Sequence, residues 1–173
     1  ATQAVAGEGP LHARIVLVGE QPGDNEDRMG RPFIGPAGRV LDDAIAAAGL
    51  TRDALYLTNT VKHFRHRKRG KVRMHERPDP WHVEQCTPFL FAELARIQPT
   101  VTLALGATAA RALLGRAGPL HSQYARIQSG RFGHRVRVAP HPAAILRSND
   151  GSRLMDILVQ ALRDAREDCT TTP

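Results

Sequence analysis

Polar side chains able to do acid–base or hydrogen-bonding chemistry follow three short apolar stretches of this sequence. They are Glu20 and Gln21 after ARIVLVG (13–19), Asn59 at the end of ALYLTN (54–59), and His141 after RVRVAP (135–140). A carboxylate can stabilise a cation or polarise a nucleophile, and an amide offers both a donor and an acceptor. A histidine held between two prolines is aimed rigidly and can donate to a developing oxyanion. The spacing predicts one site if these stretches end at the same place.

Four apolar, β-branched stretches predict strands, and helical patterns lie between and after them. The strands are expected at 13–19, 54–59, 100–106 and 135–140, and the helices at 37–50, 81–98, 107–115 and 150–168. Alternating strands and helices favour a parallel sheet covered on both faces, with ligands bound at the carboxyl ends of the strands. We therefore expect an α/β protein with three layers, α/β/α, around a central four-stranded parallel sheet, folded as a single domain over residues 1–173.

The longest loop of this pattern, GEQPGDNEDRMGRPFIGPAG (19–38), carries two further candidates, Asp24 and Phe33. Its glycines and prolines predict a shaped, non-helical backbone until about Gly35. Phe33 is either a core aromatic or a stacking platform for a nucleobase. Asn59 is likewise either a turn residue or a group that reads the edge of a pyrimidine, which presents one donor and one acceptor.

The positive charge is concentrated in one segment. The chain has a formal net charge of +7, and residues 62–77 hold eight basic residues against one acid, Glu76. We expect a basic loop insertion at about 64–78 that binds a polyanion, or else a solvated charge run. The run ends on His75, which carries chemistry that a charge run does not need.

The remaining composition bears on location. No apolar run is long enough to cross a membrane, and the first residues lack the pattern of a secretory signal, so we expect a cytoplasmic protein. The two cysteines, Cys86 and Cys169, indicate a reducing compartment. We expect a frayed tail from about 168 to 173.

Taken together, GEQPGDNEDRMGRPFIGPAG, LYLTNTVKHF, LALGATAARALLG and APHPAAILR resemble the uracil-DNA glycosylase superfamily, and within it the iron–sulfur bacterial and archaeal branch. The resemblance runs from about residue 3 to about residue 165. It implies a bacterial repair enzyme that is a monomer and acts on uracil-containing DNA. We expect single-stranded DNA to be the preferred substrate, because the target nucleotide must leave the base stack.

The basic stretch narrows the resemblance. RGKVRMH and VKHF are similar to the UdgX-like group, whose loop histidine bonds covalently to the sugar after uracil departs. The resemblance implies catalytic roles for His75, Glu20, Asp24, His141 and Arg73, uracil binding by Gly19, Gln21, Phe33 and Asn59, and contacts of Lys68, Arg69 and Lys71 with the DNA backbone. His75 must be neutral to attack, and we expect nearby arginines to lower its pKa by like-charge repulsion.

The resemblance also implies a [4Fe–4S] cluster. His63 and Cys86 stand at two of the four ligand positions, and the other two are expected in a C-x-x-C pair just upstream of ATQAV, where the given chain begins. Either a longer chain supplies that pair or the protein lacks the cluster. Cys86 read alone is equally well a small buried core residue.

Two rival functions share these features. One is a conventional uracil-DNA glycosylase that uses water as its nucleophile and turns over many times. The other is a non-catalytic protein that binds single strands through the basic loop, a reading weakened by the scarcity of aromatic residues near that loop.

Overall fold

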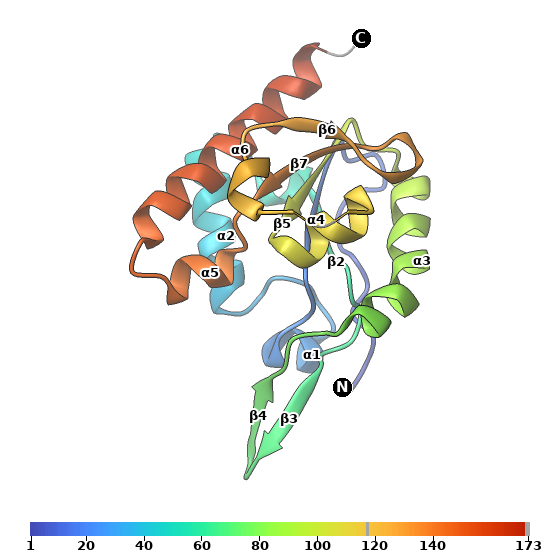
Figure 1. The fold of residues 1–173 in the computed structure, drawn as a ribbon, viewed down its shortest axis with the longest axis vertical. Helices are drawn as coiled ribbons and strands as arrows, with labels where there is room; N and C mark the ends of the chain where they lie inside the picture. The colour runs from blue at the N-terminus through green and yellow to red at the C-terminus, as the bar shows by residue number, and fades with distance from the viewer. Residues whose placement is uncertain (117, 172–173) are drawn as a thin grey trace.

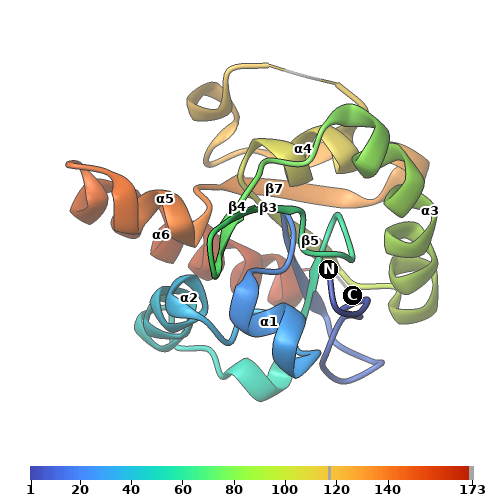
Figure 2. The ribbon, with the colours of Figure 1, turned by 90° about the horizontal axis from the view of Figure 1, so that it is seen from below.

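The computed structural model describes residues 1–116 and 118–171, which form three layers (Figures 1 and 2). The central sheet has the strand order β2-β1-β5-β7-β6. The four predicted strands are confirmed as β1 (Ile15–Gly19), β2 (Tyr56–Asn59), β5 (Val101–Leu105) and β7 (Arg135–Ala139), and all four are parallel. A fifth strand, β6 (Ile127–Ser129), adds an antiparallel edge that the sequence analysis did not predict.

Helices cover both faces of this sheet, as the predicted three-layer fold requires. One face carries α2 (Pro36–Ala47), α5 (Pro142–Arg147) and α6 (Gly151–Thr171), and the other carries α3 (Pro80–Ile97) and α4 (Ala107–Leu114). The strands β1 and β5 are buried along their whole length, and their alternate side chains enter the two cores. The sheet is therefore rigid where its carboxyl ends meet the loops.

Local sequence signals explain where the helices begin. Asp79 accepts a hydrogen bond from the backbone N–H of His82 and caps α3, with Pro80 in the first turn. Pro88 lies inside α3 and does not end it. Three short 3₁₀ turns, η1 (Arg52–Ala54), η2 (Leu120–Gln123) and η3 (Arg131–Gly133), complete the helical segments.

Two expectations are corrected by the structure. The loop after β1 is not irregular up to Gly35, because α1 (Asp24–Met29) forms within it, with acidic residues in its first turn that favour the amino end of the helix. The tail is not frayed from residue 168, because α6 continues to Thr171 and buries Cys169. The last two residues of the predicted tail, 172 and 173, lie outside the described residues.

The basic insertion folds as an antiparallel hairpin of β3 (His66–Arg69) and β4 (Val72–His75). Gly70 makes its turn with a φ of 61°, a left-handed conformation that glycine adopts without strain. Figure 1 shows the hairpin projecting from the body of the molecule, below α1. Its turn is thus held away from the sheet, while His75 lies at the end that returns to it.

Candidate active site

Four segments that are far apart in the sequence meet at Gly19, the last residue of β1. A Cβ atom built on Gly19 would lie 2.5 Å from Asn59 Oδ1, 2.6 Å from the Phe33 ring and 3.4 Å from His141 Nε2. No other residue type leaves room for these three groups at once. The sequence analysis predicted that these positions share a site, and the structure brings them together at the carboxyl edge of the sheet.

His141 offers an unused hydrogen-bond donor to this site. Its Nδ1 accepts from the backbone N–H of Ala143, 3.1 Å away, so the proton of the neutral ring is on Nε2. Burial lowers the pKa of His141 to about 4, an effect that Glu20 only partly opposes. Nε2 is buried and has no hydrogen-bond partner among the described residues. The imidazole is therefore a neutral, preorganised donor.

Asn59 offers the complementary acceptor. Its Oδ1 is also buried without a partner among the described residues. Hydrogen bonds fix the backbone around Asn59. The Lys62 ammonium donates to the Asn59 carbonyl at 2.7 Å, and the backbone N–H and hydroxyl of Thr60, the next residue, both donate to the carbonyl of Gly19. One donor and one acceptor left unsatisfied side by side match a planar ring whose edge presents an acceptor beside a donor.

Phe33 lies beside this pair in a strained backbone conformation. Its φ of 53° is unusual for an aromatic residue, and its ring centre lies 6.3 Å from that of His141. Arg52 donates to the carbonyls of Pro32 and Phe33, and the buried Glu26 carboxylate accepts from the backbone of the next two residues. These contacts hold the ring at the site. The sequence analysis named neither Arg52 nor Glu26, since neither belongs to a recognisable local motif.

Glu20 and His75 lie together at the rim. Glu20 Oε1 is 3.6 Å from His75 Nε2, and its other oxygen accepts from the Thr108 hydroxyl at 2.5 Å. His75 is half-exposed, and its pKa is lowered mainly by burial and further by Arg147, while Glu20 raises it. The neutral imidazole predicted for His75 is thus favoured, but the cause differs from the one expected, which was repulsion by the arginines of its own loop.

Asp24 and Arg73 are not directed at Gly19. Arg73 binds the carboxylates of Asp24 and Asp27, and Asp24 also binds Arg28. Asp27 is completely buried; burial raises its pKa, but hydrogen bonds from Thr2, Arg73 and Gln3 outweigh that effect and lower it to about 2. Their contacts join β4 to α1 and so position the loop that carries His75. The predicted catalytic roles of Asp24 and Arg73 gain no support from this geometry.

Gln21 also holds the hairpin. Its side-chain amide donates to the carbonyls of Arg65 and Glu76 and accepts from the N–H of Arg65, which closes the base of the loop. The predicted DNA contacts Lys68, Arg69 and Lys71 lie at the turn and are exposed. Lys62 was counted among the eight basic residues of 62–77, but it does not belong to the exposed charge. It is buried and paired with Glu93 at 2.7 Å, so its charge is not available to a polyanion.

The candidate cluster ligands are only a partial set. Cys86 is buried, with its Sγ accepting from the N–H of Lys62 at 3.5 Å, and the neighbouring His63 is exposed. Within residues 1–116 and 118–171, no group of three or more histidine, cysteine or acidic side chains could hold a metal ion. Two ligands do not hold a [4Fe–4S] cluster, so the residues present do not match the group.

None of the helices in the described part of the chain is both long and apolar enough to cross a bilayer.

The fold and the site define an α/β protein with a buried donor and a buried acceptor, both unpartnered among the described residues, at the carboxyl edge of a parallel sheet. The model of the uracil DNA glycosylase superfamily matches residues 6–163, and the chain belongs to this superfamily. The chain is 36% identical over 151 residues to a type-4 uracil-DNA glycosylase of Pyrobaculum aerophilum, covering 83% of this chain and 74% of the relative. It is 36% identical over 152 residues to that of Archaeoglobus fulgidus, covering 84% and 73%.

A shorter match adds detail. Over 108 residues the chain is 42% identical to the type-4 uracil-DNA glycosylase of Thermotoga maritima, which covers 62% of this chain and 53% of that relative. The predicted superfamily is therefore confirmed.

Proposed function

We propose that this protein excises uracil from DNA and that His75 then captures the sugar. The observation that carries the first part is the buried, unpartnered pair of Asn59 Oδ1 and His141 Nε2 beside the Phe33 ring. Uracil presents an N–H between two carbonyl oxygens, so Asn59 can accept from the N–H while His141 donates to the adjacent oxygen. The matched relatives are named as uracil-DNA glycosylases, which supports the same assignment.

Cleavage follows from the electrostatics of this pocket. As the bond between C1′ and N1 breaks, its electron pair leaves with uracil. Negative charge then builds on the uracil carbonyl oxygen that His141 faces. A fixed donor at that position stabilises the transition state more than the ground state. The sugar becomes cationic, and the carboxylate of Glu20, oriented by Thr108, stabilises it.

Capture requires a nucleophile next to the same carbon. The nitrogen of His75 that faces Glu20 is Nε2, 3.6 Å from Oε1. In the neutral tautomer that carries its proton on Nδ1, the Nε2 lone pair attacks C1′ and forms the C–N bond. The ring is then cationic beside Glu20, and loss of the Nδ1 proton to solvent makes it neutral again. No step of this scheme uses a metal cluster.

The substrate we propose is single-stranded DNA, acted on by a monomeric protein in the bacterial cytoplasm. Extrusion of the target nucleotide costs least in an unpaired strand. The exposed basic turn at Lys68, Arg69 and Lys71 suits a flexible polyanion.

The second candidate function is ordinary excision, in which water takes the place of His75 and the enzyme turns over. The names of the matched relatives favour it, because each is a uracil-DNA glycosylase. The two functions share every residue of the pocket and differ only in the fate of C1′.

Denaturing electrophoresis of protein incubated with a uracil-containing oligonucleotide distinguishes them. We expect a protein–DNA band that survives heat and detergent, and peptide mass spectrometry that places the adduct on His75. His75→Ser should abolish the band. The matched control is His66→Ser. His66 pairs with His75 across the hairpin, so this substitution also removes one imidazole from the hairpin.

Three outcomes would contradict parts of this proposal. Free abasic product with no adduct supports the ordinary glycosylase and removes the capture step. An adduct that persists in His75→Ser assigns capture to another residue. Equal binding of uracil- and thymine-containing strands without any uracil release leaves only a non-catalytic single-strand binder.

A further inference from the structure

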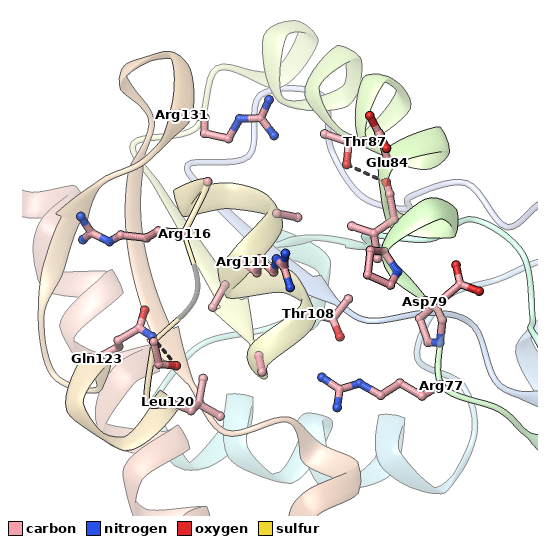
Figure 3. Close-up of a pocket in the computed structure, with 18 of the residues that line it drawn as sticks. Arg77, Asp79, Glu84, Thr87, Thr108, Arg111, Arg116, Leu120, Gln123 and Arg131 are labelled. Carbon is pink, nitrogen blue, oxygen red and sulfur yellow. Dashed lines mark hydrogen bonds between the residues drawn. The ribbon is translucent and has the colours of Figure 1, made fainter.

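A deep groove runs away from the active site between α3 and α4. It encloses about 970 Å³ and is lined by residues of both helices and of the segments that follow β4 and α4 (Figure 3). Two of its lining residues, Thr108 and Arg77, are also neighbours of Glu20: the Thr108 hydroxyl donates to it, and the Arg77 guanidinium lies 4.0 Å from it. The groove therefore begins where the sugar of the target nucleotide would lie.

Positive charge lines the groove along its length. Arg77 stands at its start, Arg111 on α4 at its middle and Arg131 at its far end. Figure 3 shows the Arg111 side chain pointing from α4 toward α3 and the Arg77 side chain lying below Thr108. Two acidic side chains lie on its wall: Asp79 is engaged by Arg65 and His82, and Glu84 is outnumbered by the four lining arginines, Arg77, Arg111, Arg116 and Arg131. The groove thus offers cationic groups to an anion more readily than anionic groups to a cation.

Exposed aromatic surface lies at the far end. Phe132 does not line the groove itself but follows its lining residue Arg131 in the chain; it is 77% exposed, and its φ of 58° is unusual for an aromatic residue. The Phe91 ring meets it edge-on at 4.9 Å, and the Arg131 guanidinium lies 5.5 Å from its centre. A cationic groove that ends on an exposed ring is the arrangement by which proteins bind single-stranded nucleic acid, with phosphates on the arginines and a base on the aromatic face.

We propose that this groove with the adjacent Phe132, here called the arginine groove (Arg77, Arg111, Arg131 and Phe132), holds the DNA strand on one side of the target nucleotide. The eight residues of α4 span about 12 Å, which corresponds to roughly three or four stacked nucleotides. The arginine groove therefore extends the substrate from one nucleotide to a short segment. This inference rests on the proposed function, since the strand is taken to enter from the uracil pocket.

Oligonucleotides extended on one side at a time test the arginine groove. Uracil is placed near one end, the strand is lengthened by one nucleotide per step toward either the 5′ or the 3′ side, and the second-order rate constant of uracil loss is measured under single-turnover conditions. For the wild-type protein, we expect lengthening on one side only to raise this constant about tenfold, reaching a plateau within roughly four nucleotides.

The double variant Arg111→Ala/Arg131→Ala and the variant Phe132→Ala should lose this gain, leaving less than about a twofold dependence on length. The matched control is Arg163→Ala, an exposed arginine on α6 across the sheet, which should keep the full gain. An unchanged length dependence in the double variant, or equal gains on both sides in the wild type, would overturn the inference.

Binding of labelled thymine-only strands separates this inference from the proposed function. For the wild type, affinity should rise with length to the same plateau, and Arg111→Ala/Arg131→Ala should reduce the salt dependence of log K by about 1.4 for two lost phosphate contacts. If no uracil is released but this pattern holds, the proposed function fails and the arginine groove stands. If binding is independent of length and of both arginines, the arginine groove fails whatever the activity.

Discussion

The proposed function assigns uracil recognition to Asn59 and His141, because each has one buried polar atom without a partner among the described residues. A buried polar atom without a partner costs stability, so such atoms are rare in folded proteins. Here two of them face the space beside Gly19, one an acceptor and one a donor. Because His141 is neutral down to about pH 4, the donor is present throughout the physiological range. The cost of leaving both atoms unpaired is offset only when a complementary ring enters.

His141→Leu tests this assignment. The substitution keeps an apolar group of similar size in the buried position and removes the Nε2 donor. We expect the single-turnover rate of uracil release to fall by about 10²–10³-fold, the loss typical of one oxyanion donor. Oligonucleotide affinity should change little, because the donor matters most when the bond breaks. A loss of less than tenfold would place the main donor elsewhere.

The pH dependence of stability provides the control for that variant. The unfolded His141 binds a proton below about pH 6.5, whereas the folded residue stays neutral down to about 4. The unfolded state therefore binds more protons in this window, and the free energy of unfolding of the wild type falls as the pH drops, by up to about 3 kcal/mol from this residue. His141→Leu should lack that contribution. Parallel curves for the two proteins would show that His141 is not buried and neutral.

At the scale of elements, the β3–β4 hairpin is anchored to the rest of the protein at its base, and its turn projects away. Gln21 binds the backbone at its base, and Arg73 joins β4 to Asp24 and Asp27 of α1. The Arg73 guanidinium also lies 5.4 Å from the centre of the buried Phe64 ring. No such contact with the turn at Gly70 is made by residues 1–116 or 118–171. The residues that position His75 therefore differ from those at the turn that are proposed to attract DNA.

The triple variant Lys68→Ala/Arg69→Ala/Lys71→Ala should weaken DNA binding without affecting folding. Three lost phosphate contacts reduce the slope of log K against log salt by about 2 for a single strand. The thermal midpoint should stay within about 1 °C of the wild type, since exposed charges contribute little to stability. Fluorescence anisotropy at several salt concentrations and a thermal melt measure the two quantities.

Arg73→Ala is the matched comparison for the triple variant. It removes one charge from the base of the same hairpin and leaves the buried Asp27 without its guanidinium partner. We expect its thermal midpoint to fall and the His75 adduct to form more slowly. If the triple variant melts as early as Arg73→Ala, the turn has a structural role and is not simply a DNA contact.

The elements predicted from the sequence are those whose burial leaves a periodic pattern. β1 and β5 are buried along their whole length and are mostly apolar, and α2 and α6 place an apolar stripe on the sheet, so all four were found. Helix α1 and strand β6 were missed because their stability comes from contacts made elsewhere: α1 is held through Asp27 by the first residues of the chain, and β6 by its pairing with β7. The sequence around them carries no comparable pattern.

For the site, the sequence predicted which residues lie close together but not all of their contacts. Residues at strand ends, such as Asn59 and His141, were found because the carboxyl edge of a parallel sheet brings them together. The catalytic role of Arg73 stays a prediction, and its contacts with Asp24 and Asp27 of α1 were not predicted, since a basic residue within a charge run gives no sign of its partner. Lys62 was misjudged for the same reason, because its partner Glu93 lies 31 positions away.

At the scale of the whole molecule, Glu93 of α3 joins three segments beneath the pocket. Its carboxylate accepts from Lys62 Nζ at 2.7 Å, from the Thr58 hydroxyl at 2.8 Å and from the backbone N–H of Gly7 at 2.9 Å. Lys62 in turn donates to the carbonyl of Asn59. Burial lowers the pKa of Lys62, and Glu93 opposes that shift, so the ammonium depends on this carboxylate to stay charged. The pair therefore links the first residues of the chain and α3 to Asn59, the residue proposed to bind uracil.

Glu93→Gln should destabilise the protein by about 3–5 kcal/mol, because it leaves the buried Lys62 ammonium without a counter-charge. Lys62→Met/Glu93→Gln should be less destabilised than Glu93→Gln alone, since no unpaired charge remains. Urea unfolding of the wild type, both single variants and the double variant gives the coupling energy. The excision rate of the double variant distinguishes an effect on the position of Asn59 from an effect on folding. If the pair positions Asn59, the rate falls even where the protein is fully folded. Additive destabilisation, with no coupling, would mean that water or a moved side chain already screens Lys62 from Glu93.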